Sequence, residues 1–150
     1  MTDVAPTLVR AQAGQEGGSA ADAARGRVLI VEDEYFVALD AEEALTSAGY
    51  EVCGIATSAE EAVALAEAER PELVLMDIRL LGPRDGIEAA AEIRQRLGLR
   101  SLFATAHSDS ATRARAEAAA SPLGWLIKPY SREQLNGAVG AAMARLRRRG

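Results

Sequence analysis

The sequence lacks the features that mark secreted, membrane-spanning and nucleic-acid-binding proteins. It has one cysteine, Cys53, so no intrachain disulfide can form, and the apolar run around this residue predicts a small buried side chain. No apolar run approaches the roughly 18 residues that a membrane-spanning helix needs. The formal net charge of −5 argues against non-specific binding to nucleic acid. We therefore expect a cytoplasmic protein with no membrane partner.

The chain divides into a leader and one domain. Residues 1–25 are rich in Ala, Gly, Gln and Ser and lack the apolar stretch of a signal peptide, so we expect a flexible leader. Residues 26–150 form the predicted domain. Because 49% of the chain is hydrophobic, there are enough apolar side chains for one core.

Short apolar runs alternate with helical patterns throughout the domain. Short runs bounded by polar or turn residues are typical of buried parallel strands. We expect strands at residues 27–31, 51–55, 73–77, 100–104 and 125–127, and helices at about 34–48, 59–68, 87–97, 110–119 and after Ser131. This strict alternation predicts an α/β fold, with a doubly wound five-stranded parallel sheet between two helical layers.

The helices carry local signals of their own. The first is expected to pack through an apolar face that includes Phe36. Ser58 with Glu61, and Ser131 with Gln134, match the pattern of a capping box at the second and last helices. The fourth helix has almost no large apolar side chains, so we expect it to be the most mobile.

Polar side chains stand where four of the predicted strands end. Glu32 and Asp33 follow the first strand, and Asp77 ends the third. Thr105 follows the fourth strand and Lys128 follows the fifth. In an open parallel sheet, ligands bind outside the carboxyl ends of the strands. Carboxylates, a hydroxyl and an ammonium gathered there suit a divalent metal and a phosphoryl group.

These residues and the short motifs around them resemble the response-regulator receiver domain of two-component signalling. The resemblance covers roughly residues 26 to 147 and rests on residues 28–33, Asp77, Asp85-Gly86, Thr105-Ala106 and Lys128-Pro129. It implies the flavodoxin-like strand order 2-1-3-4-5. It also implies a stand-alone regulator that receives phosphate from a histidine kinase or a histidine phosphotransfer protein and then changes its protein contacts.

The resemblance assigns the residues that hold the metal and the phosphate. Asp77 matches the phosphoacceptor, whose carboxylate forms an acyl phosphate when charge on the phosphoryl oxygens is neutralised. Glu32 and Asp33, together with Asp77, would hold Mg²⁺, and the backbone carbonyl of Arg79 would be a further ligand. Lys128 would pair first with Asp77 and then with a phosphoryl oxygen.

Five positions, among them Arg79 again, match family residues that bind the phosphoryl group, respond to it or set its lifetime. The Thr105 hydroxyl and the backbone N–H of Ala106 would donate to it. Trp125 stands where the family has an aromatic that moves inward after phosphorylation, with a partly buried surface aromatic as the alternative. Arg79 and His107 occupy the two positions that tune the lifetime of the phosphoryl group, although an exposed loop histidine explains His107 equally well.

Two other functions remain open from the sequence. An aspartate-nucleophile phosphatase has a related sheet but needs a second acid two residues after the nucleophile, where Arg79 stands. A phosphorylation-independent scaffold would carry no phosphate on Asp77. We favour the phosphoacceptor, which is not an enzyme beyond catalysing its own phosphorylation and dephosphorylation.

Three features bear on partners. The loop between Asp77 and Asp85 has one residue more than the family pattern, which bears on partner choice. The resemblance allows a homodimer through helix 110–119, the last strand and the last helix. The tail at 145–149 is rich in arginine, but no helix-turn-helix or other nucleic-acid module follows it, so we do not expect nucleic-acid binding.

Overall fold

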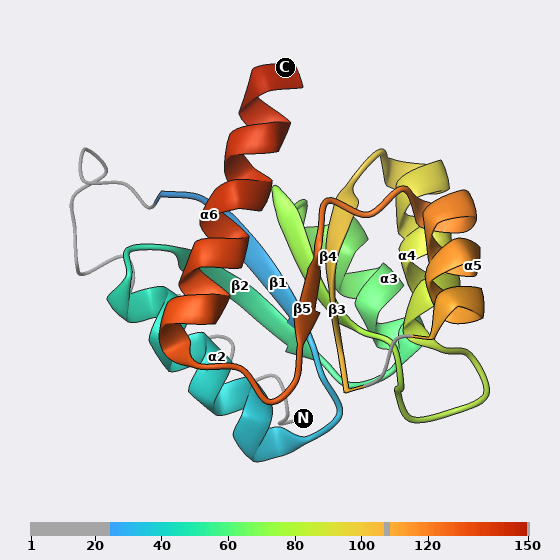
Figure 1. The fold of residues 1–150 in the computed structure, drawn as a ribbon, viewed down its shortest axis with the longest axis horizontal. Helices are drawn as coiled ribbons and strands as arrows, with labels where there is room; N and C mark the ends of the chain where they lie inside the picture. Colours follow the sequence, from blue (N-terminus) through green and yellow to red (C-terminus); the bar gives the residue numbers. More distant parts are fainter. Residues whose placement is uncertain (1–24, 107–108, 150) are drawn as a thin grey trace.

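A five-stranded parallel sheet with helices on both faces makes up the fold (Figure 1). The computed structural model describes residues 25–106 and 109–149. The strands are β1 (Arg27–Val31), β2 (Glu51–Ala56), β3 (Leu73–Asp77), β4 (Arg100–Thr105) and β5 (Trp125–Ile127). The helices are α2 (Tyr35–Ser47), α3 (Ala59–Glu69), α4 (Gly86–Leu97), α5 (Ser110–Ala120) and α6 (Arg132–Arg149). No helix in this part of the chain has the length and hydropathy to cross a bilayer.

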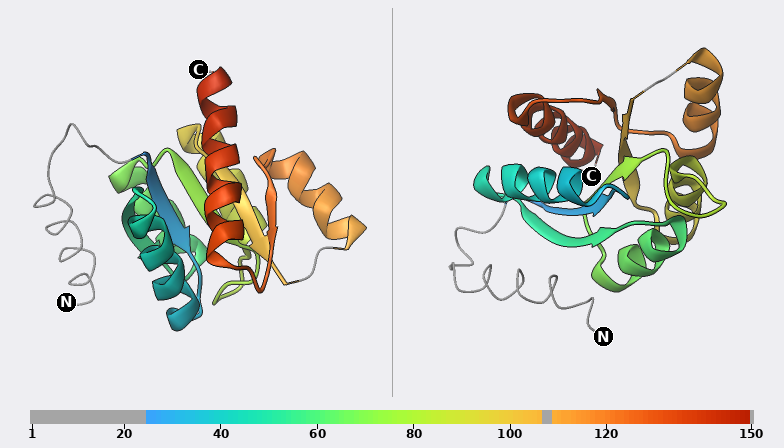
Figure 2. Two further views of the ribbon diagram at one scale, coloured as in Figure 1. Left: turned by 60° about the vertical axis from the view of Figure 1, so that its left-hand side comes forward. Right: turned by 90° about the horizontal axis from the view of Figure 1, so that it is seen from below.

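The predicted fold class and strand order are confirmed. The strands follow one another in the order β2-β1-β3-β4-β5, and every predicted element lies within one residue of its observed bounds. Helices α2 and α6 cover one face of the sheet, while α3, α4 and α5 cover the other (Figure 2). The short apolar runs were therefore a reliable sign of strands, and β1, β3 and β4 are buried on both faces.

The alternation of side chains along the strands decides where the polar residues point. Ile30 joins the core under α2 and α6, whereas Val31 joins the core under α3, α4 and α5. Val31 is paired with Met76 across β1 and β3. The next residues, Glu32 and Asp77, therefore lie side by side at the carboxyl edge, on the face covered by α2 and α6.

The two expected capping boxes have different outcomes. At α6, the Gln134 N–H donates to Ser131 Oγ at 3.0 Å and the Ser131 N–H donates to Gln134 Oε1 at 2.8 Å, as predicted. At α3, the Glu61 N–H donates to Ser58 Oγ at 3.1 Å, but Glu61 Oε1 accepts from the N–H of Thr57 at 2.8 Å. The Ser58 cap predicted at α3 is present, but the reciprocal bond is not. The Glu61 side chain accepts from the N–H of Thr57 and not, as a capping box requires, from that of Ser58.

The expectation that Phe36 packs into the core is wrong. Phe36 is 81% exposed and its neighbour Tyr35 is 66% exposed. The core residues of α2 come from its later turns, namely Ala38, Ala41, Ala44 and Leu45. The first turn of α2 projects beyond the carboxyl edge of the sheet, where no strand lies beneath it (Figure 1).

Cys53 is buried, as predicted. Its Sγ donates to the carbonyl of Val28 at 3.6 Å. Burial raises the pKa of the Cys53 thiol to about 11, so the thiolate that would react with oxidants or metals is not populated near neutral pH. Cys53 therefore serves as a small core residue.

The arginine-rich tail holds the end of α6 against the rest of the domain. Arg145 Nη1 donates to the carbonyl of Leu123 at 2.8 Å, just before β5. Arg147 Nη2 donates to the carbonyl of Arg25 at 2.6 Å, just before β1. These two arginines thus have a structural use at the amino edge of the sheet.

Candidate functional site

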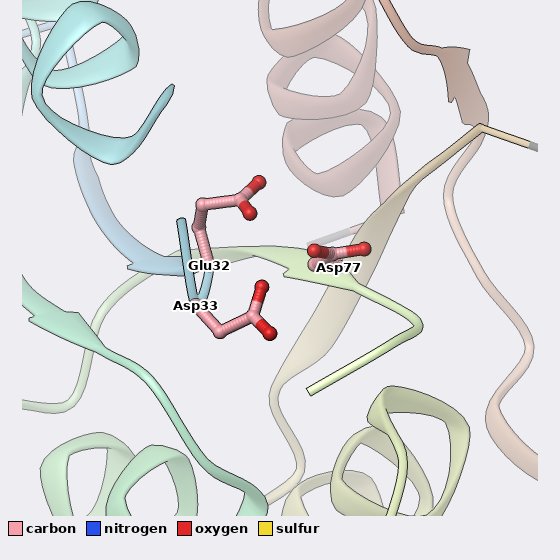
Figure 3. Close-up of side chains that lie close together, drawn as sticks. All are labelled: Glu32, Asp33 and Asp77. Atoms are coloured by element: carbon pink, nitrogen blue, oxygen red, sulfur yellow. The ribbon is translucent and has the colours of Figure 1, made fainter. Parts of the chain in front are cut away.

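Three carboxylates meet at the carboxyl edge of the sheet. Figure 3 shows the side chains of Glu32, Asp33 and Asp77 gathered around a common space. One carboxylate oxygen from each residue lies within 4.8 Å of those from the other two. Glu32 and Asp77 are 4% and 6% exposed, and Asp33 is half-buried. The adjacency of β1 and β3 in the sheet produces this cluster from residues far apart in the sequence.

Lys128, the only lysine of the chain, bridges two of these acids. Its Nζ donates to Glu32 Oε1 at 3.0 Å and to Asp77 Oδ2 at 3.3 Å. The contact with Asp77 matches the expectation from the sequence, whereas the shorter contact with Glu32 was not expected. The Lys128–Pro129 peptide bond is cis.

Burial governs the protonation of this cluster. Desolvation raises the pKa of Glu32 to about 7, and the hydrogen bond from Lys128 offsets this only in part. Desolvation also raises the pKa of Asp77 against the opposing charge of Lys128. At Lys128, burial opposes the ammonium, but its contacts with Glu32 and Asp77 outweigh that effect and raise its pKa. The cluster thus has more negative charge than one ammonium compensates, and a further cation would favour the ionised carboxylates.

The raised pKa of Glu32 predicts an unusual dependence of stability on pH. Between the ordinary value of 4.5 and about 7, folded Glu32 retains a proton that the unfolded chain has lost. The free energy of unfolding should therefore fall as pH rises through this window in metal-free buffer. We expect the melting temperature of the wild type to decrease from pH 5 to pH 8, and the decrease to be smaller with Mg²⁺.

Two variants isolate the contribution of Glu32 to this slope. Glu32→Gln cannot ionise, so its melting temperature should change less with pH than that of the wild type. Glu60→Gln alters an exposed glutamate on α3 and should keep the wild-type slope. If the melting temperatures of the wild type and Glu32→Gln changed equally with pH, the raised pKa of Glu32 would not be the cause of the dependence.

The backbone around Asp77 is tightly held. Asp77 Oδ1 accepts from the N–H of Arg79 at 3.3 Å, and the N–H of Gly86 donates to the carbonyl of Ile78 at 2.6 Å. A Cβ at Gly86 would lie only 1.9 Å from the carbonyl oxygen of Asp77. Glycine is therefore required where α4 begins, because any side chain would collide with the backbone that carries Asp77.

A cleft of about 780 Å³ opens beside the acids. Asp33, Asp77 and Lys128 line it together with Thr105 and Ala106, so the structure brings the predicted hydroxyl and small residue to the same space. Thr105 is buried and Ala106 is exposed. The cleft thus brings carboxylates, an ammonium and a hydroxyl together.

Arg79 also lines the cleft, with an exposed side chain. Its backbone N–H is engaged with Asp77, as described above. The use of its carbonyl as a metal ligand, and of its side chain in tuning the phosphoryl lifetime, stay predictions.

An apolar wall of the cleft was missed in the sequence. It consists of Phe36 and Val37 from α2, with Pro129 and Tyr130 from the loop after β5. Burial raises the pKa of Tyr130 to about 12, so its phenol is neutral at ordinary pH. Phe36 and Val37 come soon after the acidic pair, and Pro129 and Tyr130 come directly after Lys128. A single sequence does not show that these four side chains face the cleft.

Trp125 is not among the residues that line the cleft. Its indole packs on Phe103 with ring centroids 5.2 Å apart, and the Arg113 guanidinium lies 4.5 Å from the Trp125 ring centroid. Its Nε1 donates to Glu117 Oε2 at 3.2 Å. A switching role for Trp125 stays a prediction, as does the role of His107, which lies outside the described residues.

The donor set fits Mg²⁺. Glu32, Asp33 and Asp77 offer only oxygen ligands, which this hard cation prefers, and they are few enough to leave places for water and phosphate oxygens. Burial raises the pKa of Glu32 and of Asp77, and a bound dication would favour their ionised forms. These three residues would hold the ion.

Comparison with known proteins agrees with this geometry. The family model of the response regulator receiver domain matches residues 28–140. The transcriptional regulatory protein PdtaR of Mycobacterium tuberculosis is 42% identical over 81% of the chain and 58% of its own length. The phyllosphere-induced regulator PhyR of Methylorubrum extorquens is 29% identical over 94% of the chain and 52% of its own length. The chain thus spans little more than half of these two relatives.

Two solved structures of similar shape are receiver domains. The signal receiver domain of a modulated diguanylate cyclase from Desulfovibrio desulfuricans G20 is 35% identical, with a TM-score of 0.76, over 83% of this chain and 98% of that one. A CheY-like receiver domain protein from Methanospirillum hungatei is 26% identical, with a TM-score of 0.74 and the same coverage. Both likenesses extend over nearly the whole of the matched chains.

Proposed function

The chain belongs to the response-regulator receiver family, and from this premise we propose that Asp77 is its phosphoacceptor. Receiver domains accept phosphoryl groups in two-component signalling. The observation that carries the assignment is the position of the Lys128 ammonium, 3.3 Å from Asp77 and 3.0 Å from Glu32 at the edge of an acidic cleft. The phosphodonor would be a histidine kinase or a histidine phosphotransfer protein.

The residues of the cleft account for each part of the transfer. An oxygen of Asp77 attacks the phosphorus of the phosphohistidine, the P–N bond breaks, and its electron pair remains on the imidazole. The Lys128 ammonium then contacts a phosphoryl oxygen, while the Thr105 hydroxyl and the Ala106 N–H donate to the others. Mg²⁺ bound by the three carboxylates would neutralise charge on the phosphoryl oxygens.

The acceptor role is favoured over an aspartate-nucleophile phosphatase. Such an enzyme needs a general acid two residues after the nucleophile, and Arg79 stands there in place of a carboxylic acid. The domain would therefore act on no separate substrate, and catalyse at most its own phosphorylation and dephosphorylation.

The surface beside the cleft supports a protein as the phosphodonor. Tyr35 and Phe36 are 66% and 81% exposed, and Phe36 lines the cleft itself. Exposed aromatic side chains at the rim of a polar site are typical of protein contacts.

Two further parts of the proposal concern assembly and location. The domain would form a homodimer through α5, β5 and α6, and it would act in the cytoplasm.

Phosphate transfer from acetyl phosphate tests the assignment. Wild-type protein should incorporate hydroxylamine-labile phosphate in the presence of Mg²⁺ and lose this capacity in EDTA. Asp77→Asn should incorporate none, because an amide oxygen forms no acyl phosphate. Asp40→Asn, which changes an exposed acid that also lines the cleft, should behave as the wild type. Equal incorporation by the wild type and Asp77→Asn would end the proposal.

A further inference from the structure

The loop between β3 and α4, residues 78–85, carries a predicted metal ligand, and its middle part is exposed (Figure 1). Arg79 in this loop would offer its backbone carbonyl to Mg²⁺, and its N–H donates to Asp77 Oδ1 at 3.3 Å. Leu80 packs against the core under α3, α4 and α5, but residues 81–83 are exposed. Because burial does not fix this exposed part of the loop, its position depends on backbone contacts.

A backbone contact reaches the exposed part of the loop from the turn between β2 and α3. Leu81 is paired with Ser58 in an isolated parallel bridge, and the Leu81 N–H donates to the carbonyl of Thr57 at 3.4 Å. Leu81 lies two residues after Arg79, so this contact limits where the Arg79 carbonyl can lie. A hydrogen bond this long is weak, and it can hold the loop only if Thr57 is itself fixed.

Glu61, in the first turn of α3, fixes Thr57. Its Oε1 accepts from the Thr57 N–H at 2.8 Å and from Thr57 Oγ1 at 3.1 Å. Hydrogen bonds to a carboxylate are stronger than those between neutral groups, and these two restrain both the backbone and the side chain of Thr57. This is the departure from a capping box described above, and it directs the Glu61 carboxylate to the residue that meets the loop.

We propose that Glu61 is a positioning residue for the metal site: by fixing Thr57, it holds the β3–α4 loop where the Arg79 carbonyl can reach the ion. Glu61 acts through Thr57 and Leu81. A ligand that is held in place beforehand loses less freedom on binding, so a freer loop binds Mg²⁺ more weakly. The holding of the loop stands on the contacts alone, whereas the effect on Mg²⁺ rests on the proposed function.

Calorimetric titration with Mg²⁺ tests the effect on the metal. Glu61→Ala should bind Mg²⁺ about three- to tenfold more weakly than the wild type, which is less than the roughly 10- to 100-fold loss when a group touching a ligand is removed. Glu61→Gln keeps a side-chain oxygen that can accept both bonds from Thr57, so its affinity should lie within about twofold of the wild type. Agreement of this variant with the wild type would separate the hydrogen bonds from the charge.

Glu60→Ala is the matched control for charge in this helix. Glu60 is exposed and lies in the same first turn of α3. Its replacement removes an equal charge and leaves the contacts between Glu61 and Thr57 intact, so Mg²⁺ affinity should be that of the wild type. Unchanged affinity in Glu61→Ala, or an equal loss of affinity in Glu61→Gln or Glu60→Ala, would overturn the proposal.

Limited digestion of the metal-free protein with trypsin tests the holding of the loop. Trypsin cleaves after arginine, and Arg79 is exposed in the loop. Because cleavage needs local opening of the chain, Glu61→Ala should be cut after Arg79 about two- to fivefold faster than the wild type and Glu61→Gln, as mass spectrometry of the fragments would show. Equal rates would refute the holding role. If the wild type bound no Mg²⁺, the proposed function would be contradicted instead, and the digestion would still decide the holding role.

Discussion

Replacing Lys128 with alanine is expected to slow phosphorylation by acetyl phosphate about 10²- to 10³-fold at saturating Mg²⁺. Lys128 Nζ already contacts Asp77 Oδ2, and it is the only lysine of the chain. Without this ammonium, no other side chain described in the cleft, apart from the Arg79 guanidinium at its rim, brings a positive charge to the phosphoryl oxygens. Single-turnover labelling at a series of Mg²⁺ concentrations would separate a slower chemical step from weaker metal binding.

An arginine variant controls for loss of positive charge at this edge of the domain. Arg132→Ala removes an exposed cation that pairs with Asp40 and Glu43, and it should phosphorylate at the wild-type rate. Circular dichroism would establish that Lys128→Ala remains folded. A rate for Lys128→Ala within threefold of the wild type would show that Lys128 has no part in the transfer.

Replacing Gly86 with alanine should disturb both stability and the site. The added Cβ would lie 1.9 Å from the carbonyl oxygen of Asp77, 2.8 Å from its carbonyl carbon and 2.9 Å from Ile78 Cα. All three are backbone atoms, so no rotamer change can relieve the collision. We expect the free energy of unfolding in urea to fall by about 1–3 kcal/mol or more, and phosphorylation to be lost as Asp77 shifts.

A matched substitution separates this collision from a general effect of alanine. Gly137 lies within α6, and a Cβ there would meet nothing within 4 Å. Gly137→Ala should therefore raise the free energy of unfolding, by up to about 1 kcal/mol, and leave phosphorylation unchanged. Similar effects of the two substitutions would show that the close approach of Gly86 to Asp77 has no consequence.

Features that depend on local pattern were predictable from the sequence. The apolar runs at β1 and β3 are short and end in acids, and the rule for parallel sheets places such ends at one edge. The cluster of Glu32, Asp33 and Asp77 follows from that rule once the strand order is known. The resemblance to receiver domains supplied the order, which no pattern of apolar residues encodes.

Features that depend on tertiary position were not predictable. Phe36 fits a helical apolar pattern, yet it lies on a turn that extends past the sheet, and periodicity does not record where the sheet ends. The contact of Arg115 with Asp85 joins residues 30 positions apart. The contact between Lys128 and Glu32 joins residues 96 positions apart. It depends on how far the ends of β1 and β5 lie from each other, which the sequence does not specify.

Reduction of the phosphorylated protein with borohydride, followed by peptide mapping, tests the account most directly. Borohydride converts an aspartyl phosphate to homoserine and so marks the residue that carried the phosphate. We predict homoserine at position 77, formed only when Mg²⁺ was present during phosphorylation. Reduction at Asp33 or Glu32 instead, or phosphate retained on His107 with Asp77 unmodified, would contradict the account.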